Sequence, residues 1–317
     1  MTAPLHIPVM LERCVDLLAP VATSESFIID CTLGLGGHSA ALLQRLPHVT
    51  VLGIDRDPAA LQRASARLAE FGSRFVPIHA TYDAVAEVAA NYVAESGKQC
   101  RGILFDLGVS SMQLDFAERG FAYAQDAPLD MRMDQSTGIT AAELLASSSA
   151  AELTQLFKRY GDEPLASRYA AAIVAARETT PLTRSTELVE VLQEATPAKM
   201  KNLRHPAKRV FQALRVAVND ELTVLAAAIP NALQALAVGG RIVVMAYQSH
   251  EDKIVKNAFA QVSRDRTPAG LPQQLPEFAP AFKLLTRGAE QASAAEQETN
   301  PRSIPVRLRA AEKVRET

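Results

Sequence analysis

Ser26-Phe-Ile-Ile-Asp-Cys-Thr32 is a run of mostly apolar residues that predicts a buried strand. A glycine turn, Gly34-Leu-Gly-Gly-His38, follows it, and residues 39–46 continue with the apolar spacing of a helix. A second apolar run, Val49-Thr-Val-Leu-Gly-Ile-Asp55, predicts another buried strand and ends in an acid. Strand, turn, helix and strand in this order are typical of a βαβ unit, so the segment predicts a parallel sheet.

Further strands extend the same sheet. Asp57-Pro58 has the N-cap and the first-turn proline of a helix start. The strand expected at 74–79 is weaker, because a proline inside it lacks an amide donor. Gly102-Ile-Leu-Phe-Asp-Leu-Gly108 and Gly240-Arg-Ile-Val-Val-Met-Ala-Tyr247 predict two stronger strands, and residues 303–311 a last one.

The interval between residues 108 and 240 is far longer than the crossover of about a dozen residues that joins two parallel strands. We therefore predict an insertion, and apolar residues at helical spacing make it mostly helical. A long helix over 209–229, closed by Pro230, then returns the chain to the sheet domain. The predicted helices of the insertion are 141–145, 150–160, 165–178 and 186–195.

The chain is thus predicted to be an α/β protein with a Rossmann-like sheet and an inserted, mostly helical domain. Residues 1–110 and 210–317 are expected to form a discontinuous sheet domain, and residues 111–209 the insertion. Towards the C-terminus, the proline-rich stretch 268–280 predicts an irregular loop. The Ala-, Glu- and Gln-rich stretch 289–298 is expected to be mobile.

The composition excludes several classes of protein. The chain has 317 residues, of which 48% are hydrophobic, and a formal net charge of −2, so it can bury a sizeable core and has no global basic surface. Cys14, Cys31 and Cys100 form no C-x-x-C pair, which argues against a disulfide framework or a thiolate zinc site. The histidines lack metal-ligand spacing, so no metal is expected. Without a long apolar run, we expect a soluble, cytoplasmic protein without membrane contacts.

The glycine turn and Asp55 together predict a site for an adenosine-containing cofactor. Glycines let backbone amides approach a ligand closely, and an acid at the end of the second strand can bind ribose hydroxyls. Ser39 replaces the third glycine of the dinucleotide fingerprint, which argues against a nicotinamide dinucleotide as the cofactor. S-adenosylmethionine has no pyrophosphate to bind, so its binding turn can be looser. A turn that only connects two elements is the alternative. His38 is either a cofactor contact or a hydrogen-bonding residue at the helix start.

A second group of polar residues surrounds the end of the strand at 102–108. Asp106 lies at the carboxyl end of a middle strand, which faces the ligand crevice in open α/β sheets. The loop after it is polar, contains Gly108, Ser110 and Ser111, and so favours a functional role. A strand-terminal cap is the alternative role for Asp106.

The segment from Ala195 to Asn219 is locally basic. It carries His205 and several lysines and arginines but no acid, so it predicts a positive surface suited to phosphate contacts. A solvated helix face is the alternative interpretation. The candidate nucleic-acid contacts are Lys199, Lys201, Arg204, Lys208, Arg209 and Arg215.

Short motifs occur in a fixed order along nearly the whole chain. They are His6-Ile-Pro-Val-Met10, Thr32-Leu-Gly-Leu-Gly-Gly-His38, Gly53-Ile-Asp-Arg-Asp-Pro58, Asp106-Leu-Gly-Val-Ser-Ser111, Glu118-Arg-Gly-Phe121, Pro128-Leu-Asp-Met-Arg-Met-Asp134, His205-Pro-Ala-Lys-Arg209, Phe211-Gln-Ala-Leu-Arg215, Val218-Asn-Asp-Glu-Leu222 and Asn300-Pro-Arg-Ser303. With this set of motifs the chain resembles the ribosomal RNA small-subunit methyltransferase H family, also called MraW.

The resemblance implies an enzyme that transfers a methyl group from S-adenosyl-L-methionine to N4 of a cytidine in the decoding region of small-subunit ribosomal RNA. It implies that the partner is this RNA or the assembled small subunit, with the insertion as the RNA-recognition domain. The oligomeric state stays open, a homodimer being one option. The cofactor-binding residues that the resemblance implies are Gly36, Gly37, His38, Asp55, Tyr82 (usually Phe in the family), Asp106 and Gln113. Gly34, the first glycine of the turn, is expected to contact the cofactor as well.

The amine of cytosine is a poor nucleophile, so catalysis of this reaction must come mainly from placement. We expect Asp106 to accept a hydrogen bond from the amine or to fix the cofactor, with Ser110 and Ser111 assisting. The chain departs from the family in one motif, where Ala246-Tyr-Gln-Ser-His-Glu-Asp252 stands in place of the usual Ser-Phe-His-Ser-Leu-Glu-Asp. Gln248 thus replaces a histidine.

Two other classes of function stay open on the sequence. A methyltransferase that acts on a small molecule or a protein needs no basic surface, so the segment from Lys199 to Arg215 distinguishes it from an RNA enzyme. A non-catalytic ribosome-assembly factor would keep the basic surface but tolerate loss of the cofactor turn. The intact turn and Asp55 argue against that class.

Overall fold

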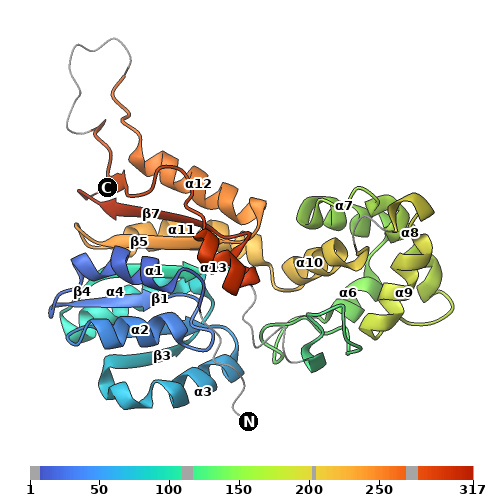
Figure 1. The fold of residues 1–317 in the computed structure, drawn as a ribbon, viewed down its shortest axis with the longest axis horizontal. Helices are drawn as coiled ribbons and strands as arrows, with labels where there is room; N and C mark the ends of the chain where they lie inside the picture. The colour runs from blue at the N-terminus through green and yellow to red at the C-terminus, as the bar shows by residue number, and fades with distance from the viewer. Residues whose placement is uncertain (1–7, 109–116, 202–204, 269–277, 317) are drawn as a thin grey trace. The chain divides into compact units, whose positions relative to one another are not determined.

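The computed structural model describes residues 8–108, 117–201, 205–268 and 278–316 (Figure 1). The chain divides into two compact units, one formed by residues 1–108 with 222–317 and the other by residues 109–221. The predicted boundary before residue 210 is wrong. Helix α10 (Ala207–Val218), which spans that position, packs against the helices of the insertion and so belongs to the second unit.

The first unit holds, within the described residues, a seven-stranded sheet in the order β3-β2-β1-β4-β5-β7-β6. The first five strands run parallel, and β7 is antiparallel to both of its neighbours. This order confirms the predicted α/β, Rossmann-like sheet, with its switch point between β1 and β4. The strands are β1 Ser26–Asp30, β2 Thr50–Asp55, β3 Phe75–His79, β4 Gln99–Asp106, β5 Arg241–Ala246, β6 Phe282–Leu284 and β7 Arg307–Lys313.

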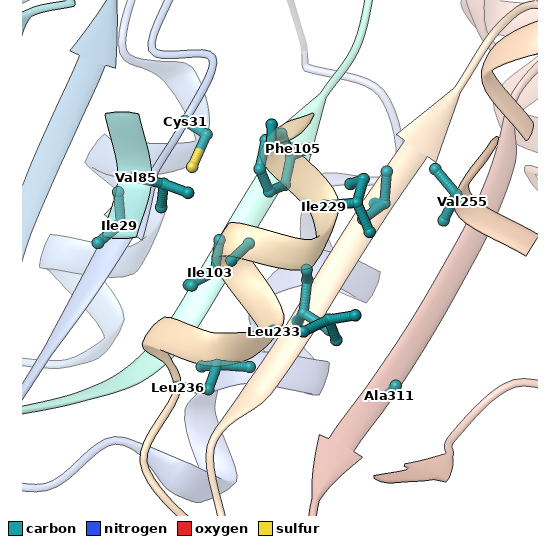
Figure 2. Packing of buried hydrophobic residues seen from close by; sticks show 14 of the residues in the cluster. Ile29, Cys31, Val85, Ile103, Phe105, Ile229, Leu233, Leu236, Val255 and Ala311 are labelled. Carbon is teal, nitrogen blue, oxygen red and sulfur yellow. The ribbon is translucent and has the colours of Figure 1, made fainter. Parts of the chain in front are cut away.

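Helices cover both faces of this sheet. Ile103 and Phe105 of β4 point to the face covered by α4, α11 and α12, where Ile229 and Leu233 of α11 lie against them (Figure 2). Leu104 points to the opposite face, which α1, α2 and α3 cover. Neighbouring residues of one strand therefore enter separate cores, as expected for a strand buried on both sides. These helices are α1 Leu11–Leu18, α2 Gly37–Arg45, α3 Pro58–Arg67, α4 Val85–Ser96, α11 Glu221–Ala235 and α12 Ser249–Ser263.

Parallel pairing brings the carboxyl ends of the central strands to one edge of the sheet. Asp30 ends β1, Asp55 ends β2, Asp106 ends β4, and Tyr247 follows β5. Ligands of open α/β sheets bind outside this edge, beside the switch point. The fold thus brings together four polar side chains that lie far apart in the sequence.

The second unit is helical, as the sequence predicts. Its core is built from buried faces of the helices together with the loop residues Met131 and Met133. Capping boxes begin α6 and α7, with Thr140 and Ser149 as the N-cap residues. The helices are α6 Ala141–Ser147, α7 Ala150–Gly161, α8 Ala166–Arg177, α9 Ser185–Ala195 and α10 Ala207–Val218.

The single long helix predicted over 209–229 is wrong, because the chain breaks between α10 and α11. Asp220 has a left-handed backbone with φ of 49°, and the buried side chain of Asn219 turns back to the loop before α6. Pro230 does not close a helix but lies inside α11. A proline removes one backbone hydrogen bond there, and burial of Ala232 and Leu233 beyond it keeps the helix continuous.

The C-terminal part is more ordered than predicted. The stretch 289–298, expected to be mobile, contains the start of helix α13 (Ala294–Thr299), whose N-terminus is capped by Ser293. Glu296 of this helix accepts a hydrogen bond from the N–H of Met10 at 2.6 Å. The predicted last strand begins later, at Arg307, because the residues before it form a short 3₁₀ helix. Short 3₁₀ segments are η1 Ala19–Val21, η2 Ala69–Arg74, η3 Tyr82–Ala84, η4 Ala117–Arg119, η5 Ala198–Met200 and η7 Pro301–Ser303.

The sequence patterns do not predict α1 and α4, which pack on the sheet, or β6, which is its edge strand. Within the described ranges, no helix combines the length and the apolar character needed to cross a membrane.

Candidate active site

The glycine turn between β1 and α2 has the backbone that only glycine adopts easily. Gly34 and Gly36 have φ values of 53° and 72°, in the left-handed region. Gly37 opens α2, and a Cβ atom there would lie 2.3 Å from Cγ of Pro8. No side chain caps this helix start in the described structure. The turn therefore presents the backbone N–H groups of the first helical turn at the carboxyl edge of the sheet.

Asp55 is tied to this turn. Its Oδ2 accepts the N–H of Gly34 at 2.8 Å, and its Oδ1 accepts the N–H of Asp57 at 2.9 Å. Burial raises the pKa of Asp55 to about 6, against the effect of these two hydrogen bonds. Above that pH the carboxylate is ionised, and each oxygen has a further lone pair that can accept a hydroxyl of a ligand.

Asp30 and Ser39 form a pair that the sequence analysis does not identify. The Ser39 hydroxyl donates to Oδ2 of Asp30 at 2.7 Å, and both residues are buried. Burial raises the pKa of Asp30, while the nearby His38 and the Ser39 hydroxyl oppose the rise. Ser39, which stands where a dinucleotide fingerprint has glycine, thus holds the end of β1 to α2. The sequence signal that could have identified this pair is Asp30 itself, an acid within an otherwise apolar strand.

The side chain of Asp106 is held by neighbouring residues and is still partly exposed. The Tyr247 hydroxyl donates to its Oδ1 at 2.7 Å, and Nδ1 of His38 lies 3.7 Å from its Oδ2. Its backbone N–H donates to the Thr32 hydroxyl at 2.6 Å. Burial raises the pKa of Asp106, and His38 and Tyr247 oppose the rise. The side chain keeps 26% of its surface exposed, so a substrate group can reach it.

His38 is held by the protein on both sides of its ring. It is buried, with Nε2 3.1 Å from the carbonyl oxygen of Val9 and Nδ1 facing Asp106. These contacts favour the helix-start role over a direct side-chain contact with a cofactor.

Tyr82 lies in η3, soon after β3 at the same edge of the sheet. Its ring packs edge-to-face on Phe105 with a centroid distance of 5.7 Å, and it is half-buried. This place is compatible with an aromatic contact to a nucleobase. Ser110, Ser111 and Gln113 lie outside the described residues.

Tyr247 and Gln248 connect β5 to α12. The backbone N–H groups of both residues donate to Oε2 of Glu251, each at 2.9 Å. Gln248, which replaces the histidine usual in the resembled family, is the N-cap residue of α12. Sequence reasoning misses Tyr247, because nothing in the local pattern indicates that its hydroxyl reaches Asp106.

The second unit carries the predicted basic surface in part. Lys199, Lys201 and Lys208 are exposed. Arg209 is half-buried and donates through Nη1 to the carbonyl oxygen of Asp162 at 2.5 Å. Arg204 lies outside the described residues.

Arg215 does not belong to this surface, and its prediction is corrected. Its guanidinium group makes two hydrogen bonds to Glu221, at 2.7 and 2.9 Å, and only 13% of its side chain is exposed. Glu221 lies just beyond the acid-free segment, so an inspection of that segment alone misses the neutralising charge.

An aromatic pair of the second unit includes His205, which lies close to Lys208 in the chain. The rings of Tyr123 and His205 stack with a centroid distance of 4.5 Å and an interplanar angle of 24°. Phe211 supports Tyr123 edge-to-face at 5.9 Å, and His205 is exposed. Sequence reasoning includes His205 but misses Tyr123, because the two residues are distant along the chain.

Comparison with known proteins identifies the family. Residues 3–314 match the MraW methylase family. The chain belongs to this family. Ribosomal RNA small subunit methyltransferase H of Beutenbergia cavernae is 56% identical over 317 residues, which cover 99% of this chain and 94% of the relative. The protein of the same name from Leifsonia xyli subsp. xyli is 55% identical over 313 residues, which cover 98% and 95%.

Among solved structures, the chain is similar to an rRNA methylase from Streptococcus thermophilus, with a TM-score of 0.43 and 16% identity over 99% of this chain and 100% of that chain. Membership of the MraW methylase family confirms the resemblance and the predicted class of methyltransferase, with S-adenosyl-L-methionine as its cofactor.

The residues at the carboxyl edge fit such a cofactor. The ionised Asp55 suits a ribose diol, and the uncapped start of α2 suits the carboxylate of an amino acid. The ring of Tyr82 suits adenine, and the carboxylates of Asp30 and Asp106 suit a nearby sulfonium charge. Within the described ranges, no group of three or more His, Cys, Asp or Glu residues is arranged to hold a metal ion.

Proposed function

We propose that this methyltransferase transfers a methyl group from S-adenosyl-L-methionine to N4 of a cytidine in the decoding region of small-subunit ribosomal RNA. The names of its relatives support a small-subunit ribosomal RNA substrate. The observation that carries the proposal is the partly exposed carboxylate of Asp106 at the end of β4, fixed through one oxygen by Tyr247. The ribosomal substrate also supports a cytoplasmic location.

The reaction needs help at the nucleophile. The lone pair of N4 is delocalised into the cytosine ring, and the amine is far too weak an acid to lose a proton beforehand. The bound cofactor supplies an electrophilic methyl group on a positively charged sulfur. N4 bonds to the methyl carbon as the carbon–sulfur bond breaks, its electron pair stays on sulfur, and N4 then loses one proton.

Asp106 suits the role of hydrogen-bond acceptor for the amine. When ionised, it can accept an N–H of the amino group, which draws the lone pair towards a tetrahedral nitrogen and aligns it with the methyl group. The same carboxylate can take up the proton released after transfer. His38 and the Tyr247 hydroxyl keep its charged form accessible despite burial.

The second unit provides a surface for single-stranded RNA in this proposal. Lys199, Lys201 and Lys208 can contact phosphates, and the exposed face of the stacked pair Tyr123 and His205 can receive an unpaired base. A nucleotide must leave its stack before its amino group can enter an active site. A small-molecule or protein methyltransferase needs neither feature.

The decisive experiment uses small ribosomal subunits from cells that lack the gene. Purified enzyme and methyl-labelled S-adenosylmethionine are added, and the RNA is digested to nucleosides and examined by tandem mass spectrometry. We expect label in N4-methylcytidine, localised to one decoding-region cytidine by fragment mapping. Label in 5-methylcytidine, in another nucleoside or in ribosomal protein contradicts the proposal. A parallel reaction with deproteinised RNA shows whether RNA alone or the assembled subunit is the substrate.

A further inference from the structure

Tyr247 links β5 to the carboxylate at the end of β4. Its hydroxyl donates to Oδ1 of Asp106, with 2.7 Å between the oxygens, although 141 positions separate the two residues. Its backbone N–H is held by Glu251 in the first turn of α12, at 2.9 Å. The backbone of Tyr247 is therefore held in place by Glu251, and its hydroxyl contacts Asp106 at the carboxyl edge of the sheet.

Asp106 lies among several other titratable groups. Asp30 at the end of β1 and the thiol of Cys14 on α1 interact with it electrostatically, and His38 on α2 faces its Oδ2. Glu251 on α12 faces Tyr247 rather than Asp106. Burial favours the protonated carboxyl of Asp106, whereas His38 and the Tyr247 hydroxyl favour the ionised one. Tyr247 is the partner in direct hydrogen-bond contact.

We propose that Tyr247 is a positioning residue for methyl transfer. Its hydroxyl fixes the rotamer of Asp106, so that the second carboxylate oxygen faces the substrate amine, and it keeps the carboxyl ionised, so that this oxygen can accept a hydrogen bond. This inference rests on the proposed function, in which Asp106 accepts the amine. The phenol keeps its own proton, because burial and the charge of Asp106 raise the pKa of Tyr247 well above its usual value. It therefore acts as a permanent donor and takes no part in proton transfer.

The test removes a single oxygen atom, that of the Tyr247 hydroxyl. Tyr247→Phe keeps the ring and removes the hydroxyl, so the pKa of Asp106 should rise further. The carboxyl carbon of Asp106 is followed by NMR in protein labelled at aspartate, with Asp106→Asn identifying its signal. We expect the carboxyl titration to move to higher pH by about one unit, a typical effect of losing a hydrogen bond to a charged group.

Kinetics on small subunits give the second readout. The acid limb of the kcat/KM profile should move to higher pH in Tyr247→Phe, by the same amount as the carboxyl titration. At pH values on the acid limb the variant should be about tenfold less active than wild type, and this difference should shrink as the pH rises. Tyr92→Phe is the matched control, because it removes the same atom from a ring on α4 that packs on Phe27, away from Asp106. It should move neither curve.

The outcomes separate this inference from the proposed function. An unchanged carboxyl titration in Tyr247→Phe overturns the inference, as does a titration that moves without any change in the pH profile. A wild-type enzyme that places no methyl group on cytosine N4 overturns the proposed function instead. A loss of activity that is equal at every pH also contradicts the inference, because it indicates a packing role for Tyr247.

Discussion

At the scale of single residues, Asp55 shows how one carboxylate can serve both the turn and a ligand. It already accepts two backbone N–H groups, so its removal affects the glycine turn as well as any bound ribose. We expect Asp55→Ala to weaken S-adenosylmethionine binding by about ten- to a hundredfold, the value of a lost charge-assisted hydrogen bond. Isothermal titration calorimetry measures it, and unchanged affinity would contradict the assignment.

The raised pKa of Asp55 adds a pH dependence to the same binding step. Its carboxyl is ionised above about pH 6 and protonated below, and only the ionised form accepts hydrogen bonds with both oxygens. Cofactor affinity of the wild-type protein should therefore fall as the pH drops through about 6. Calorimetry across this range is the measurement. If Asp55→Ala shows the same pH dependence, another group is responsible.

Asp106 offers a separate test of chemistry against folding. Asp106→Asn keeps the size of the side chain and one acceptor oxygen but loses the charge. Because burial disfavours that charge in the folded protein, its loss should leave the melting temperature within a few degrees of wild type. Methyl transfer should fall by about a hundredfold or more. Parallel losses of activity and stability would indicate that Asp106 only caps the strand.

At the scale of elements, the break between α10 and α11 depends on Asn219. Its buried side chain donates to the carbonyl oxygens of Met131 and Arg215 and accepts the N–H of Met133. Asn219→Ala removes the side-chain partner of the Met131 carbonyl and of the Met133 N–H, whereas the Arg215 carbonyl still accepts the backbone N–H of residue 219. The change should destabilise the protein by about 2–4 kcal/mol in urea unfolding.

Asn231→Ala is the matched control for this change. Asn231 lies on α11, and its side chain donates a hydrogen bond to the carbonyl oxygen of Asp83 at 2.8 Å. Its loss should destabilise by about 1 kcal/mol. Equal effects of the two substitutions would show that Asn219 has no special place in the turn.

Across the whole molecule, the net charge is close to neutral, but the second unit carries a local basic surface. Replacing Lys199, Lys201 and Lys208 by Gln removes three exposed positive charges. If each contacts one phosphate, the slope of log affinity for RNA against log salt should become shallower by about 2–3. Fluorescence anisotropy with a decoding-region RNA at several salt concentrations measures it. An unaltered slope would favour the solvated-face interpretation.

His205→Ala provides the complementary variant. It removes the exposed ring of the stack with Tyr123 and should lower RNA affinity about tenfold without changing the salt slope, because base stacking involves no counterion release. Cofactor affinity should stay constant in both variants, since neither set of residues belongs to the glycine turn or the strand ends.

The sequence alone was enough to predict every strand of the sheet except β6, together with the glycine turn and the acids Asp55 and Asp106. Burial and periodicity leave a local pattern in these strands and in the turn. The sequence also determined the helical nature of the insertion. Missing were contacts between residues distant in the chain, such as Tyr247 with Asp106. No local pattern encodes such a pair, which exists only once parallel pairing places two strand ends together.

The tertiary structure also decided which polar residues stay available. Arg215 and Ser39 look like surface or turn residues in the sequence, yet the fold pairs them with Glu221 and Asp30. It decided the end of α10 at Asn219, whose partners come from the loop before α6. The physical reason is that local propensity continues a helix or exposes a charge, whereas packing against another element, near or distant in the chain, makes the break or the ion pair more stable.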